Sequence, residues 1–85
     1  MTASIETVNV LLFASYADAF GSRRVSAPIS APCSVSQLVE ALRTLPGGAR
    51  LPERPLVAVN RNWSSADALI EQGDEVAVIP PVAGG

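Results

Sequence analysis

The chain has 85 residues, 48% of them hydrophobic, and its six arginines and eight acidic residues give a net charge of -2. This length predicts a single domain over residues 1–85, with an ordered core from about 5 to 80 and a tail over 80–85. No basic cluster is present to neutralise phosphates, which argues against nucleic-acid binding. No apolar run approaches the roughly 20 residues of a membrane span.

The side-chain inventory limits the chemistry that the chain can perform. It contains neither His nor Lys, so it lacks the usual neutral-pH general base, the commonest metal ligand and any lysine Schiff base. The single Cys33 excludes an internal disulfide and a cysteine-rich metal site. Cys33 is either a reactive nucleophile or a packed thiol, and packing is favoured because no His can activate it. We expect no metal and no cofactor bound by this chain.

Two strands are predicted in the first part of the chain. The segment "IETVNVLLFA", residues 5–14, is apolar on both faces at its middle, which is typical of a central strand. A signal peptide is not expected there, because Glu6 and no basic residue precede the apolar run, and the predicted location is cytoplasmic. "SYADAFGS" then breaks the pattern. "RRVSAPISA", residues 23–31, predicts a second strand, which Pro28 confines to a sheet edge or a bulge.

The segment "CSVSQLVEALRTLPGG", residues 33–48, carries the clearest helix signal. Its apolar residues recur at helical spacing on one face; these are Val35, Leu38, Val39, Leu42 and Leu45. Ser34 and Gln37 form a capping box, and Cys33 can contact Leu38 as a hydrophobic staple. Pro46-Gly47-Gly48 ends the helix.

The second half of the chain predicts further strands. "LVAVN", residues 56–60, is a buried strand, residues 61–75 carry turn residues around a weak segment, and "EVAVIP", residues 75–80, is a closing strand. The first and last strands are the most apolar, so we expect them to pair centrally. The result is an α+β domain in which one main helix packs on one face of a mixed sheet.

The chain finishes with "IPPVAGG", residues 79–85. Pro80 and Pro81 keep the backbone extended, and Val82 supplies one apolar contact. Ala83, Gly84 and Gly85 have little side-chain volume, so such a tail fits a slot too narrow for larger residues. The Gly85 carboxylate is sterically open but needs activation by a nucleotide. No phosphate-binding loop is present in this chain to supply it, so a second protein would have to do so.

The sequence resembles the small subunits of molybdopterin synthase, sulfur carriers with the ubiquitin-like β-grasp fold. The resemblance rests on "VLLFA" at 10–14, "SVSQLVEAL" at 34–42, "VAVN" at 57–60 and "GDEVAVIPPVAGG" at 73–85. It implies that a ubiquitin-activating-type adenylyltransferase uses ATP to adenylate Gly85. A sulfur donor protein then converts the adenylate to a thiocarboxylate. The tail would insert into the large subunit of molybdopterin synthase, so this chain alone should catalyse nothing.

The resemblance also implies site residues. Gly85 and Gly84 would carry the chemistry, while Phe13 and Ile79 would form an apolar partner-binding patch and Pro80 to Ala83 the inserted tail. Trp63 lies in the turn-like segment "NRNWSS" and is expected to anchor a partner. Phe13, Ile79 and Trp63 could also be ordinary core. Asp74 and Glu75 either meet basic partner residues or simply form a turn.

One departure and several alternatives accompany the resemblance. Ala17 and Asp18 stand where the family often carries an Arg-Glu pair, so any contact made by that Arg is in doubt. A sulfur carrier for thiamine, cysteine or tRNA thiolation has the same fold and Gly-Gly end. A protein modifier joined to target lysines through Gly85, and an interaction domain with an inert tail, are further alternatives.

Overall fold

The computed structural model describes residues 7–81. Its strands and helices run in the order β1 (Val8–Leu12), α1 (Ala14–Phe20), β2 (Arg24–Ala27), β3 (Cys33–Ser34), α2 (Val35–Arg43), a short 3₁₀ turn η1 (Gly48–Arg50), β4 (Leu56–Val59), β5 (Asn62–Ser64), β6 (Leu69–Ile70) and β7 (Val76–Ile79). Residues 1–6 and 82–85 lie outside the described part, and with them Val82, Ala83, Gly84 and Gly85.

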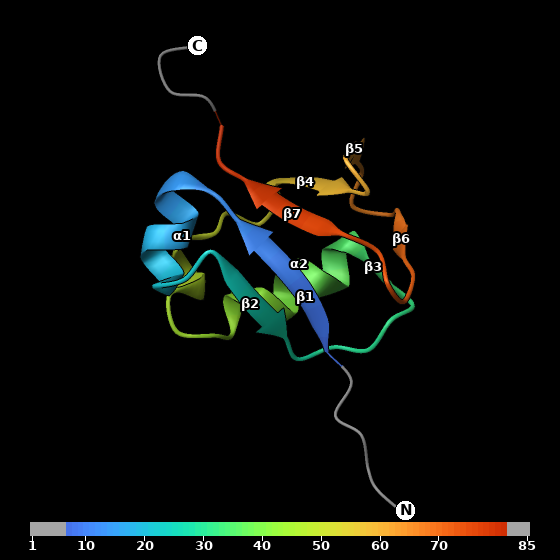
Figure 1. The fold of residues 1–85 in the computed structure, drawn as a ribbon, viewed down its shortest axis with the longest axis horizontal. Helices are drawn as coiled ribbons and strands as arrows, with labels where there is room; N and C mark the ends of the chain where they lie inside the picture. Colours follow the sequence, from blue (N-terminus) through green and yellow to red (C-terminus); the bar gives the residue numbers. More distant parts are fainter. Residues whose placement is uncertain (1–6, 82–85) are drawn as a thin grey trace, which may run out of the picture.

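The main sheet has five strands in the order β2-β1-β7-β4-β5 (Figure 1). β1 and β7, from opposite ends of the sequence, are parallel neighbours at its centre, whereas the other neighbouring pairs are antiparallel. The predicted mixed sheet and the central pairing of the first and last strands are therefore confirmed. Because the tail comes directly after β7, it leaves from a strand that is hydrogen-bonded on both sides.

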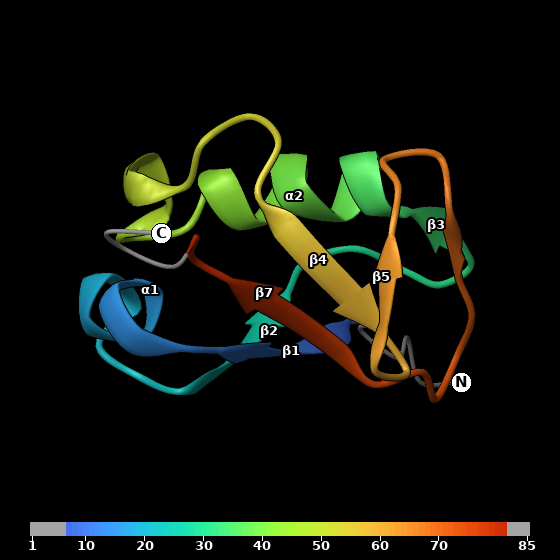
Figure 2. The same cartoon turned by 90° about the horizontal axis from the view of Figure 1, so that it is seen from above.

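The core lies between the sheet and α2, which covers one face (Figure 2). Side chains alternate across each strand, so every second residue of the three central strands points to this face. These inward residues are buried: Val8, Val10, Leu12, Val57, Val59, Val76 and Val78. They pack with the apolar side of α2. Among residues 7–81, no helix lies over the opposite face of the sheet (Figure 2).

Helix α2 forms as the sequence predicts. The Ser34 side chain accepts a hydrogen bond from the Gln37 backbone at 3.1 Å, and the Gln37 side chain accepts one from the Ser34 backbone at 2.9 Å. This capping box satisfies two amide groups that the first turn would otherwise leave without partners. Cys33, just before the cap, and Leu38 are both buried in the core. The helix ends at Arg43, before Pro46, and Gly47 and Gly48 make the next turn.

A second helix, α1, is not predicted from the sequence. It takes up most of "SYADAFGS", which the strand pattern alone marks only as a break. The N-cap Phe13 makes no side-chain capping bond, and the helix has only seven residues, so neither a cap nor a full apolar repeat marks it. Its end is marked, since Gly21 adopts the left-handed conformation typical of a glycine after a helix.

The remaining differences concern short strands. β2 is an edge strand, as Pro28 indicates, but it ends at Ala27, and residues 28–31 are not part of it. β3 and β6 form a separate two-stranded sheet that the sequence does not predict. Trp63 lies in strand β5 and not in a turn, because the turn before it is only Asn60 and Arg61. Within residues 7–81, no helix is long and apolar enough to cross a membrane.

Candidate functional site

The uncovered face of the sheet carries an apolar surface, which we call the sheet-face patch. It consists of the outward residues of four strands and of the residue directly after β1: Leu11, Phe13, Leu56, Ala58, Trp63, Ala77 and Ile79. Strand register arranges them in rows. Leu11 pairs with Ala77, Ala77 with Ala58, and Ala58 with Trp63. Leu56 pairs with Ile79 in the next row towards the tail.

The small side chains at the centre of the patch create a depression. Ala77 and Ala58 form its floor, while Leu11 and Phe13 stand on one side and Trp63 on the other. The resulting hollow measures about 350 Å³ and includes Ile79 in its wall. Trp63 is 66% exposed and Phe13 is 47% exposed. Large apolar side chains that remain this exposed around a concave floor suit the insertion of a partner's apolar side chain.

Phe13 reaches the patch because the chain changes direction directly after β1. Its backbone is extended, and its carbonyl accepts a hydrogen bond from the Tyr16 amide at 3.0 Å, which begins α1. Tyr16 is buried and turns the helix towards the core. The backbone of Phe13 therefore caps a helix while its side chain lies on the outer face. Phe13 could be a partner-binding residue or an ordinary core residue, and its exposure excludes the core position.

Trp63 is positioned by the β4–β5 hairpin. Asn60 and Arg61 both have positive φ, 52° and 69°, as a two-residue type I′ turn requires. Asn tolerates this conformation better than most residues. The tight turn places Trp63 opposite Ala58 at the edge of the sheet. Trp63 is therefore not core either, whereas Ile79 is half-buried in the wall of the hollow.

A polar network fixes this hairpin to the turn before β7. The Asn60 side chain donates to Asp74 Oδ1 at 3.0 Å and accepts a hydrogen bond from the Glu75 amide at 3.0 Å. Asp74 Oδ2 accepts a hydrogen bond from the Glu71 amide at 2.8 Å. Together, the hydrogen bonds from Asn60 and Glu71 lower the pKa of the Asp74 carboxyl. Asp74 therefore serves as a turn residue, one of the two roles that its sequence allowed.

Glu75 and Arg61 border the polar end of the patch. Arg61 Nε lies 3.7 Å from Glu75 Oε1, with both side chains largely in solvent. An exposed pair of this kind contributes little to stability. Glu75 therefore remains available to a basic group of a partner, the alternative that its sequence position left open.

The patch continues towards the tail. Ile79 is the last residue of β7, Pro80 is half-buried and Pro81 is exposed. Of the tail expected to enter a partner, Pro80 to Gly85, the last four residues lie outside the described residues; these are Val82, Ala83, Gly84 and Gly85. Because β7 leads from the floor of the hollow to Pro81, a protein that covers the patch also lies next to the point where the tail begins.

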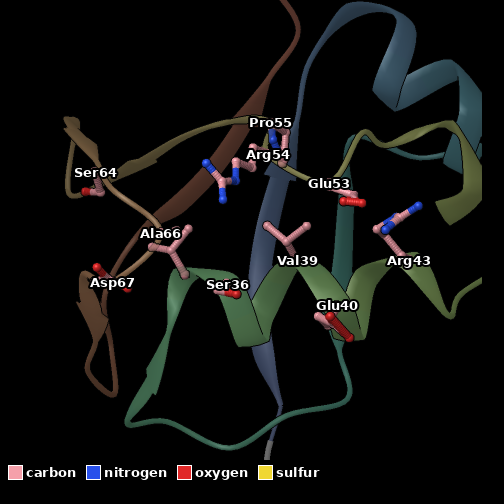
Figure 3. A pocket seen from close by; sticks show the side chains of 11 residues that line it. Ser36, Val39, Glu40, Arg43, Glu53, Arg54, Pro55, Ser64, Ala66 and Asp67 are labelled. Carbon is pink, nitrogen blue, oxygen red and sulfur yellow. The ribbon is translucent and has the colours of Figure 1, made fainter.

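A second groove lies beside α2, away from the patch. It measures about 540 Å³, with Val35 and Val39 on its helix side. Figure 3 shows charged side chains of both signs around it, with Arg43 and Glu53 pointing towards one another and Asp67 at the opposite end. None of the residues that line it belongs to the sheet-face patch. It is therefore not part of the candidate site.

The described residues show neither a metal-binding cluster nor an exposed thiol. Between Thr7 and Pro81 no group of three or more His, Cys, Asp or Glu side chains could hold a metal ion. Cys33 is buried, and burial raises the pKa of its thiol, which disfavours the thiolate needed for attack. Of its two alternatives, the structure supports the packed thiol.

Sequence reasoning missed four members of the patch: Leu11, Leu56, Ala58 and Ala77. The sequence did contain a signal for an apolar outer face. A strand with one face in solvent should alternate apolar and polar residues, whereas the first strand is apolar on both faces. What the sequence lacked was the register that aligns β1, β7 and β4. The Asn60–Asp74 network was missed for the same reason, because 14 residues separate its partners in the chain.

A family comparison decides the relationship of this chain, because the model of the ThiS family matches residues 10–85. The chain belongs to the ThiS family. The match begins within β1, at Val10, and extends through the Gly-Gly end. ThiS-family members and the solved neighbours of this chain share the ubiquitin-like β-grasp fold, so the predicted fold class is confirmed.

Solved structures give two kinds of neighbour for this ThiS-family chain. SAMP1 from Haloferax volcanii has a TM-score of 0.76 at 26% identity, over 93% of this chain and 99% of that one. A putative molybdopterin converting factor subunit 1 from Pyrococcus furiosus has a TM-score of 0.73 at 24% identity, over 91% and 99%. Subunit 1 in a complex of subunits 1 and 2 of the molybdopterin-converting factor from Helicobacter pylori has a TM-score of 0.65 at 21% identity, over 93% and 99%. All three neighbours share the fold of this chain over nearly its whole length.

Proposed function

We propose that this protein is a sulfur carrier that acts as the small subunit of a molybdopterin synthase. The observation that carries the proposal is the continuity between the sheet-face patch and the tail. Phe13, Trp63 and Ile79 surround a hollow on the strand that leads into "PPVAGG". A partner that binds the patch can therefore hold Gly85 at a defined place in its own active site.

The chemistry would begin at the Gly85 carboxylate. One of its oxygens attacks the α-phosphorus of ATP on a ubiquitin-activating-type adenylyltransferase, and pyrophosphate leaves. Sulfur at the oxidation level of sulfide, delivered by a sulfur donor protein, then displaces AMP and leaves a thiocarboxylate. The carbon stays at the carboxylic acid level throughout. Gly84 and Gly85 have no side chains to obstruct these attacks.

The proposed partner that accepts the tail is the large subunit of molybdopterin synthase. The tail would enter that subunit and transfer sulfur to a pterin precursor to build a dithiolene. The subunit 1 neighbour from Helicobacter pylori, solved together with its subunit 2, supports an equivalent pairing for this chain. The present chain would contribute the thiocarboxylate and the docking surface, and the large subunit the catalytic groups.

Protein modification is the second candidate, and the similarity to SAMP1 at 26% identity favours it. In that case the same adenylate would react with a lysine amine of a target protein, and an isopeptide bond would replace the acyl phosphate. Carriers for thiamine, cysteine or tRNA thiolation are further alternatives, with a different final acceptor. All of them need activation of Gly85 and differ only afterwards.

Reconstitution tests the proposal. Purified protein is incubated with ATP, sulfide and the ubiquitin-activating-type enzyme from the same organism, and the product is then added to the large subunit with the pterin precursor. We expect molybdopterin to form in proportion to thiocarboxylate, and deletion of Gly85 to abolish it. A thiocarboxylate that transfers no sulfur to the pterin would contradict the molybdopterin role. Gly85-dependent conjugates of high mass would instead favour the modifier.

A further inference from the structure

Arg23 and Arg24 stand next to the sheet-face patch and are not used by the proposed function. Both are exposed at the start of β2, the edge strand beside β1. Arg24 pairs with Leu11 and thus continues, on the outer face, the row of Leu11 and Ala77. The Arg23 carbonyl accepts a hydrogen bond from the Leu12 amide at 2.7 Å, so the pairing of β2 with β1 extends to this residue.

Both arginines line a second hollow at this edge of the sheet, where Arg24 lies on the outer face with Leu11 and Arg23 pairs with the inward Leu12. The hollow measures about 600 Å³ and is also lined by the apolar residues Leu11, Phe13 and Ala17. Leu11 and Phe13 also line the hollow of the patch. The two depressions therefore form one surface that is apolar near the tail and basic at the β2 edge.

The positive charge at this edge is not neutralised by the rest of the described structure. In residues 7–81 no carboxylate lies within 4.0 Å of either guanidinium, and the ion pair present joins Arg61 to Glu75. Asp18 lines the same hollow without such a contact. The backbone at this edge is also fixed, since the Ser22 hydroxyl bonds the amide and the carbonyl of Arg24 at 3.2 and 2.8 Å.

We infer that Arg24, with Arg23 next to it at the same edge, forms a second, charged half of the docking surface and receives an acidic side chain of the activating partner. The occupant is a loop of the adenylating enzyme that carries an Asp or Glu beside an apolar residue. The apolar residue enters the hollow at Phe13, and the carboxylate lies against the Arg24 guanidinium. The inference rests on the proposed function, because it concerns the protein that activates Gly85. Opposite charges at the rim of an interface accelerate association and select the partner.

Adenylation kinetics test this inference. The probe is the ubiquitin-activating-type adenylyltransferase encoded in the same genome, and the readout is pyrophosphate release as the carrier concentration is varied. The double variant Arg23→Glu/Arg24→Glu should raise the KM for the carrier roughly tenfold, about 1.4 kcal/mol, and leave kcat unchanged. Added salt should raise the KM of the wild type more than that of the variant. Arg23→Lys/Arg24→Lys keeps the charge and should stay close to the wild type.

Arg43→Glu is the matched control, since Arg43 is exposed on α2 at the covered side of the sheet. Urea unfolding of each variant verifies that it is folded. An equal KM for the double Glu variant and Arg43→Glu would overturn the inference while the proposed function stands. If the wild type itself is not adenylated, the proposed function fails and the inference falls with it.

Discussion

Under the proposed function, Trp63 is the residue on which partner binding would depend most. A tryptophan exposed to 66% exchanges little surface with the core, so stability does not explain its presence there. It faces the alanine floor of the hollow from the edge strand, where a partner can bury it completely. Desolvated aromatic side chains of this kind carry a large share of interface energy.

Trp63→Ala should therefore weaken partner binding and leave the fold intact. We expect a loss of about 2 kcal/mol in the affinity for the activating enzyme, measured by calorimetry. The free energy of unfolding should change by less than about 0.5 kcal/mol. Leu69→Ala is the control, because Leu69 is 62% exposed but lies on β6, away from the patch. Equal binding by both variants would contradict the role of Trp63.

Asp74 makes the stability of the molecule depend on pH. Its carboxylate accepts hydrogen bonds from Asn60 and Glu71, which lower its pKa in the folded state. A carboxyl with a lowered folded pKa stabilises the fold above its unfolded pKa of about 3.9, and this contribution is lost as pH falls through the folded pKa. We therefore expect the contribution of Asp74 to stability to be lost below about pH 4.

Urea unfolding from about pH 6 down to about pH 2 measures this effect. The wild-type midpoint should fall in the acid range, and Asp74→Asn should flatten that fall while lowering the midpoint near neutral pH. Asp67→Asn is the control, because no side-chain hydrogen bond to Asp67 is present among the described residues. An acid fall as steep in Asp74→Asn as in the wild type would show that other groups cause it.

The two helices show which elements the sequence reveals. α2 has a capping box and an apolar face, both local features, so its start is correctly predicted at Ser34. α1 has neither. It begins after Phe13, the residue that follows β1, where Ala14 takes a positive φ of 50°, which no local rule predicts for alanine. Tertiary packing, with Tyr16 buried in the core, outweighs the weak local preference.

The strands also differ in how clearly the sequence predicts them. β1, β4 and β7 are evident from apolar runs, because burial in the centre of a sheet needs them. β5 has three residues and β6 has two, so both are too short to show the alternation of apolar and polar residues that predicts a strand. The patch could be predicted in outline from Phe13, Trp63 and Ile79. Its alanine floor and basic edge depend on register, which long-range pairing sets.

Glycines 47 and 48 lie where the ends of α1 and α2 come close to the backbone of the next turn. A Cβ on Gly47 would collide with the Ala19 carbonyl at the end of α1, and one on Gly48 with the Leu42 carbonyl in α2. Gly47 also has a φ of 89°, which an L side chain rarely adopts. The dipeptide is therefore required for close backbone approach.

Gly47→Ala should destabilise the protein more than Gly21→Ala. Both positions have positive φ, but a Cβ on Gly21 meets nothing within 4 Å. Gly21→Ala should cost about 1 kcal/mol for its conformation alone. Gly47→Ala adds a backbone clash and should cost at least about 2 kcal/mol. Thermal unfolding of the two variants measures the difference. Equal costs would mean that the chain relaxes freely around residue 47.

At the scale of the whole molecule, the two faces of the sheet have separate tasks. One face, under α2, supplies the apolar core that holds β1 and β7 together. The other is left open and carries the sheet-face patch. Because β7 belongs to both faces, the fold gives the tail a rigid origin beside the docking surface. Under the proposed function, this arrangement would let a chain without His or Lys take part in chemistry that other proteins catalyse.

The most direct test of the sulfur-carrier account is the mass of the protein purified from its own host under non-reducing conditions, with fragmentation of the C-terminal peptide. Replacement of one oxygen by sulfur adds about 16 Da, nearly the same as oxidation of Met1, so fragmentation must locate the change. We predict that it lies on Gly85. If Gly85 remains a plain carboxylate even with the activating enzyme, ATP and a sulfur donor present, the sulfur-carrier account is wrong.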